Sequence, residues 1–97
     1  MHIQITGKHL DTGAALREHV EEHIHRITQK FFDKSSDIHV TFSKQGAFIQ
    51  CDIGMHLDMG IHLQSHDSDT DIYVSFDGAL QKIEKQLRRH KRRIRDH

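Results

Sequence analysis

The chain has 97 residues, 35% of them hydrophobic and 29% charged, which suits one small folded domain with a single core. Cys51 is the single cysteine, so no internal disulfide can form, as is usual in the reducing cytoplasm. No apolar run approaches the roughly 20 residues of a membrane span, and none follows a basic start as in a signal peptide. We therefore expect a cytoplasmic protein without membrane contact.

The first third of the chain predicts a strand and then a helix. Ile3 and Ile5 alternate with polar residues, the period of a strand with one buried face. Residues 12–31 predict an amphipathic helix, with Asp11 or Thr12 as its N-cap. Its apolar stripe consists of Leu16, Val20, Ile24, Ile27 and Phe31.

Three further strands are predicted in the middle of the chain, because apolar and polar residues alternate over 38–43, 49–57 and 61–64. The segments 44–47 and 58–60 are short and contain glycine, as hairpin connections usually do. This alternation favours antiparallel pairing, with one face of the sheet covered and the other open.

A long helix is predicted from about residue 71, and the polar cluster 66–70 is expected to end the sheet and cap this helix. The order strand, helix, three strands, helix predicts an α+β fold in one domain, 1–97. Two helices would pack on one face of a four-stranded sheet. The apolar stripe of the last helix consists of Ile72, Phe76, Leu80, Ile83, Leu87 and Ile94.

The net charge of zero hides a segregation of the two signs. Residues 82–97 carry eight Lys or Arg against two acids, a net of +6, and residues 1–81 carry six against twelve, a net of −6. A solvated helix tail would explain a few cations, but their density favours a face that binds phosphate. The candidate RNA-binding residues on this helix are Lys82, Lys85, Arg88, Arg89, Lys91, Arg92, Arg93 and Arg95.

The eleven histidines raise the alternative of a metal-dependent hydrolase. His19, Glu22 and His23 match H-x-x-E-H, and one helix turn would place both histidines on the same side. However, histidine is more than a tenth of the chain, and the sequence singles out no third ligand. We therefore predict no enzyme, no cofactor and no small-molecule substrate.

The remaining histidines fall mainly on outward strand positions, which predicts a histidine-rich patch on the open sheet face. Such a patch could respond to pH, but the favoured interpretation is that these histidines are exposed surface residues without a function. Cys51 shares the register of Ile49 and Ile53 and is predicted to be buried, and His90 lies on the last apolar stripe. The histidines of the patch are His2, His39, His56 and His62.

The segment 71–91 resembles the last helix of the bacterial ribosome hibernation promoting factors, with their D-x-Y-x-x-x-D-x-x-x-x-K-[LI]-x-[RK]-Q-L pattern. Residues 5–8 and the helix opening at 15–20 are similar to the same family. The sequence ends at His97, directly after the basic helix, and in this respect it resembles the short form of the family, which has no C-terminal dimerisation domain.

The resemblance implies a fold similar to double-stranded-RNA-binding domains. It implies binding to rRNA in the messenger and transfer RNA channel of the small ribosomal subunit, with translation inhibited in stationary phase or stress. A partner factor that promotes ribosome dimerisation is compatible with it. The basic positions of the family correspond to Lys82, Lys85, Arg89 and Lys91, and also to Lys8 and Arg26. The alternative from the charges alone is a general module for structured RNA.

Overall fold

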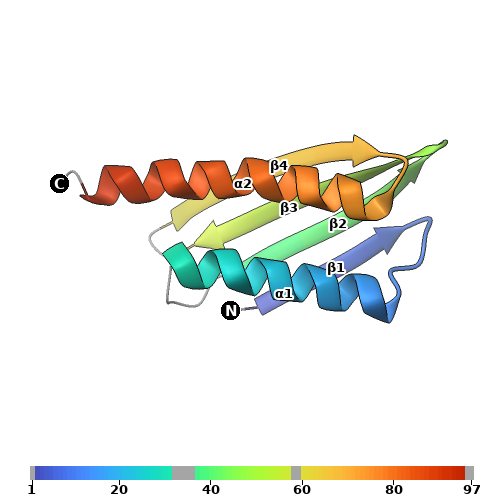
Figure 1. Ribbon diagram of the computed structural model, residues 1–97, viewed down its shortest axis with the longest axis horizontal. Helices are drawn as coiled ribbons and strands as arrows, with labels where there is room; N and C mark the ends of the chain where they lie inside the picture. Colours follow the sequence, from blue (N-terminus) through green and yellow to red (C-terminus); the bar gives the residue numbers. More distant parts are fainter. Residues whose placement is uncertain (1, 32–36, 58–59, 96–97) are drawn as a thin grey trace.

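The computed structural model describes residues 2–31, 37–57 and 60–95, with side chains for all of these except 30–31 and 91–95. It confirms the predicted element order and the two helices on one face of the sheet (Figure 1). The elements are β1 (His2–Lys8), α1 (Ala14–Phe31), β2 (Asp37–Gln45), β3 (Phe48–Leu57), β4 (Ile61–Asp69) and α2 (Ile72–Arg95).

The strands form one mixed sheet in the order β1-β2-β3-β4. β2, β3 and β4 pair antiparallel through short connections, as predicted. β1 pairs parallel with β2, because α1 carries the chain back across the sheet between them. Figure 1 shows α1 on the β1 side of the sheet and α2 along β4, so the opposite face of the sheet is left open.

The core lies between the helices and the covered face of the sheet, and it confirms the predicted alternation. Ile38, Val40 and Phe42 of β2 are fully buried, and so is Cys51 of β3. The described side chains of both predicted stripes are buried except that of Ile72, which is partly buried, and those of Phe31 and Ile94 fall outside the described part. The helical core residues are Leu16, Val20, Ile24, Ile27, Phe76, Ala79, Leu80, Ile83 and Leu87.

The prediction that the polar cluster 66–70 ends the sheet is wrong. β4 continues to Asp69, because Ser68 and Asp69 still pair with β3. The cap of α2 is instead Asp71, whose Oδ1 accepts the Tyr73 N–H at 2.8 Å and whose carbonyl accepts the Ser75 N–H at 3.0 Å. α2 begins at Ile72, one residue after the predicted start at about residue 71.

The predicted cap of the first helix is also wrong. α1 begins at Ala14, and the Gly13 carbonyl accepts the Arg17 N–H at 3.1 Å, so Gly13 precedes the first helical residue in place of Asp11 or Thr12. Glycine is tolerated at this position because the N-cap has a non-helical backbone. Neither helix is apolar enough over a sufficient length to cross a membrane, as far as the described chain extends.

The β2–β3 hairpin turns on two residues, Gly46 and Ala47, with φ of +62° at Gly46. A two-residue hairpin with positive φ at its first residue favours glycine there. We expect Gly46→Val to lower the free energy of unfolding by about 1–2 kcal/mol, because a β-branched residue is strained at this φ. Chemical denaturation would measure the loss. Ala47→Val is the control, and an equal loss in both variants would contradict the argument.

Candidate nucleic-acid interface

The cationic side of α2 is the candidate interface, and the last turns of this helix extend beyond the sheet (Figure 1). Leu87 is fully buried and His90 is half-buried, so the helix is anchored up to these residues. The molecule is accordingly elongated, 46 Å by 20 Å by 20 Å. The cations along α2 are therefore presented on a rigid, docked element.

Lys82 is tied to β4 by the protein's own acceptors. Its Nζ donates to the carbonyl oxygen of His66 at 2.9 Å and lies 3.6 Å from Oδ1 of Asp67. Asp67 can approach the helix because Gly78 has no side chain, and a Cβ at that position would collide with its carboxylate. Part of the Lys82 charge is therefore already compensated.

Lys85 and Arg89 have no ion pair with any residue whose side chain is described, in contrast to Arg88, whose Nη1 lies 3.6 Å from Oε1 of Glu84. The Arg88–Glu84 pair is exposed, and such pairs contribute little to stability. All three side chains are exposed and available to a phosphate. Lys85 and Arg89 are the strongest candidates, because neither is paired with an acid whose side chain is described.

Two larger grooves and a smaller one follow α2 along the β4 edge, and the two larger ones contain most of these cations. The first of the larger grooves has a volume of about 360 Å³ and the second about 530 Å³. Gln86 Nε2 donates to the Gln64 carbonyl at 2.7 Å, which covers part of the free edge of β4. The first groove is lined by Gln64, Ser65, His66, Lys82, Lys85, Gln86 and Arg89. The second is lined by Asp67, Gly78, Gln81, Lys82, Glu84, Lys85 and Arg88.

The grooves add glutamines to the predicted set of cations, and sequence reasoning missed them. Gln64 lies on β4 and Gln86 on α2, the next element of the chain, and their contact depends on how α2 docks against this strand. The amide groups could donate to or accept from sugar hydroxyls and phosphates. No local sequence signal distinguishes them from ordinary surface glutamines.

The other predicted RNA-binding residues do not all join this site. Lys8 ends β1, at the sheet edge opposite β4, and Arg26 lies on α1, where its Nη2 is 3.8 Å from Oε1 of Glu22. The structure therefore separates Lys8 and Arg26 from the grooves along α2. Lys91, Arg92, Arg93 and Arg95 belong to α2, but their side chains lie outside the described set.

Among the described side chains, His19, Glu22 and His23 do not come together as a metal site. The ring of His23 hydrogen-bonds the His19 carbonyl through Nδ1 at 2.8 Å, and Nε2 of His19 lies 3.4 Å from Oδ1 of Asp77 on α2. Glu22 is instead paired with Arg26 on the exposed side of α1. Over the residues described, no three His, Cys, Asp or Glu side chains are placed to hold a metal ion.

Cys51 does not act as a surface nucleophile. Burial raises the pKa of its thiol from the ordinary 9.0 to about 12, and the carboxylates of Asp52 and Asp67 add to the shift. Because the thiolate is the reactive form, we expect no alkylation of the folded protein by iodoacetamide at about pH 8. Mass spectrometry would show complete alkylation after unfolding in urea. Rapid labelling of the folded protein would contradict the buried position.

Together the sheet, the two docked helices and the cationic edge define a small α+β domain with a surface suited to a polyanion. Residues 3–95 match the family described as Sigma 54 modulation protein / S30EA ribosomal protein, and the chain belongs to this family. The resemblance to ribosome hibernation promoting factors is thereby confirmed.

The chain is similar to named relatives over its whole length. It is 36% identical over 97 residues to a ribosome hibernation promotion factor of Rhizobium meliloti, covering all of this chain and 51% of the relative. It is 29% identical over 98 residues to the ribosome hibernation promoting factor of Escherichia coli K12, with both covered completely. The chain thus spans about half the length of the first relative, and the short form stays a prediction.

Solved structures share the fold. The N-terminal domain of Thermus thermophilus Protein Y superposes with a TM-score of 0.84 at 26% identity, covering 93% of this chain and 99% of that one. A ribosomal subunit interface protein from Coxiella burnetii gives a TM-score of 0.82 at 31% identity, covering 94% and 98%.

Proposed function

We propose that this protein is a cytoplasmic ribosome hibernation factor that acts by binding, without catalysing a reaction. It binds rRNA of the small subunit in the channel used by messenger and transfer RNA, and so inhibits translation in stationary phase or stress. The observation that carries the proposal is the docked cationic side of α2, where Lys85 and Arg89 lie beside a groove. Family membership and the names of the relatives support it.

The proposed mechanism is occupancy. Each Lys or Arg that neutralises a phosphate releases condensed counterions, which favours binding without reading the sequence. Arginine can also hold two phosphate oxygens at once. The buried stripe of α2 fixes the direction of these cations, so they engage the rRNA as one face. A bound copy would exclude messenger and transfer RNA by filling their path.

The test is co-sedimentation of the purified protein with isolated small subunits. We expect association at about 50 mM salt that weakens steeply towards 200 mM, as phosphate contacts require. Messenger RNA or initiator transfer RNA bound in advance should compete with the protein. Failure to sediment with small subunits at low salt would refute the proposal.

A second candidate is a general module for structured RNA. It is favoured by the described cations, which form a backbone-binding face without an evident reader of base edges. Equal affinity for any RNA duplex, with no competition by transfer RNA on the subunit, would select this function.

Promotion of ribosome dimerisation, with the help of a partner factor, belongs to the proposal as a separate step. Gradient sedimentation of stationary-phase ribosomes with and without the protein would test it. Paired ribosomes only in the presence of the protein would support dimerisation, whereas silenced single ribosomes would limit its role to inhibition.

A further inference from the structure

The open face of the sheet collects histidines in register. The register places His2, Asp37, His56 and His62 in one row across all four strands. Side chains alternate between the two faces of a strand, so the next rows on this face lie two residues further along. These rows are Gln4, His39, Gly54 and Gln64, and then Thr6, Thr41, Asp52 and His66. All five histidines are exposed.

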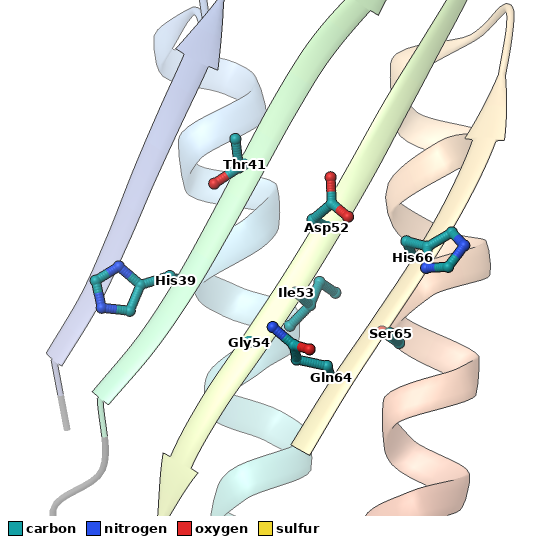
Figure 2. Close-up of a pocket in the computed structure, with 8 residues that line it drawn as sticks. All are labelled: His39, Thr41, Asp52, Ile53, Gly54, Gln64, Ser65 and His66. Carbon is teal, nitrogen blue, oxygen red and sulfur yellow. The ribbon is translucent and has the colours of Figure 1, made fainter. Parts of the chain in front are cut away.

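Gly54 leaves a hollow in the middle of this face, with a volume of about 440 Å³ (Figure 2). A Cβ built on Gly54 would meet no atom within 4 Å, so the space above it is open. Figure 2 shows His39 directed towards β1 and Gln64 lying beside Gly54. The hollow therefore has a floor of strand backbone and polar side chains around it.

Asp52 gives the hollow an oriented acceptor. Nε2 of Gln50 lies 3.2 Å and 3.1 Å from the two carboxylate oxygens of Asp52 and donates to them. The remaining lone pairs of this carboxylate can accept N–H groups of a ligand. Such an acceptor matches the amino group of a base such as cytosine.

Next to the hollow, the imidazole rings of His56 and His62 stack on each other. Their ring centroids are 4.1 Å apart and their planes differ by 14°. His56 lies two residues from Gly54 on the same strand, so pair and hollow are neighbours on one surface. Imidazole rings are among the platforms on which unpaired RNA bases stack.

We propose that the open face is a second RNA-binding surface, and that it takes single-stranded RNA. Bases stack on the imidazoles of His56, His62 and His39, while one base edge enters the hollow and donates to Asp52. A four-stranded sheet with aromatic rings on its open face is an arrangement that other RNA-binding domains use for unpaired bases. This surface lies across the sheet from α2 and does not rest on the proposed function.

The charges of the face favour a ligand that binds through its bases. The charged groups here, among the described side chains, are Lys8, Asp37 and Asp52, a formal −1 with histidine counted as neutral. Because this face has no excess of cations, stacking and hydrogen bonding would carry the binding in place of phosphate contacts. Both helices pack on the other face of the sheet.

The test measures fluorescence anisotropy of a short labelled single-stranded RNA with the full chain. We expect the wild-type protein to bind this RNA. Gly54→Val fills the hollow, and His56→Ala with His62→Ala removes the pair. Each variant should weaken binding about tenfold, the scale of a lost base stack. Ser68→Val on the same face and His25→Ala on α1 are the matched controls.

The α2 cations also attract RNA, so salt and a duplex probe separate the two surfaces. Single-strand binding through the bases on the open face should persist at salt concentrations that remove phosphate binding by the α2 cations. The sheet variants should bind a duplex with the same affinity as the wild type. Single-strand affinity that is equal in wild type and sheet variants would overturn the proposal. Sheet variants that bind the RNA normally but lose ribosome association would also overturn it, and would assign the face to a protein partner.

Discussion

Replacing Arg88, Arg89, Arg92 and Arg93 with glutamate is expected to abolish association with the small subunit while the domain stays folded. The change reverses four of the eight cations of α2 and shifts the net charge from zero to −8. Each lost phosphate contact would lower the slope of log affinity against log salt by about 0.9. Repulsion between the new carboxylates and phosphates adds to this loss.

The fold should survive, because Arg88 and Arg89 are exposed and lie opposite the buried stripe. Four acids near a helix C-terminus oppose the macrodipole, which costs a few tenths of a kcal/mol to about 1 kcal/mol each at most. Sedimentation with small subunits measures binding, and circular dichroism measures the fold. The same four positions changed to lysine keep the charge and should retain most of the binding.

A second control separates position from net charge. Arg89→Glu and Lys44→Glu alter the net charge equally, but Lys44 lies near the β2–β3 hairpin, away from the grooves of α2. Only Arg89→Glu should weaken ribosome association. Unchanged sedimentation of the fourfold glutamate variant, or equal weakening by both single changes, would refute the cationic side of α2 as the interface.

The fold was largely predictable because burial imposes its period on the sequence. The strict alternation in β2 and the stripe from Phe76 to Leu87 both identify the residues that face the core. The end of β4 was not predictable, because its inward residues there are polar. Ser65 donates through Oγ to the Ala79 carbonyl at 2.7 Å, and Asp67 lies beneath Gly78, so tertiary contacts replace apolar side chains.

The candidate site was predictable in its location and not in its detail. Charge density alone indicated the cationic side of α2. Which cations are compensated depends on how α2 docks on β4, since the acceptors of Lys82 are the His66 carbonyl and Asp67. Similarly, Gly54 looked like an ordinary strand residue. Its role as the floor of a hollow follows from the register of β2, β3 and β4.

Phe76→Ala should cause the largest loss of stability among single core changes on α2. Its side chain is fully buried, with its ring centroid 6.5 Å from that of Phe42 and 5.6 Å from that of His19. Truncation removes the contacts of Phe76 with both Phe42 on β2 and His19 on α1 and leaves a cavity. We expect the free energy of unfolding to fall by about 3–5 kcal/mol.

Such a loss is large for a domain whose total stability is roughly 5–15 kcal/mol. Thermal denaturation should show a midpoint lower by roughly 4–8 °C for each kcal/mol lost. Val74→Ala is the matched control, because Val74 lies on the same helix and is 48% exposed, so its truncation leaves no cavity. Equal midpoints for the two variants would mean that the first turns of α2 are not anchored through Phe76. Ile83 and Leu87, which are both fully buried further along α2, would then have to fix the direction in which the cations point.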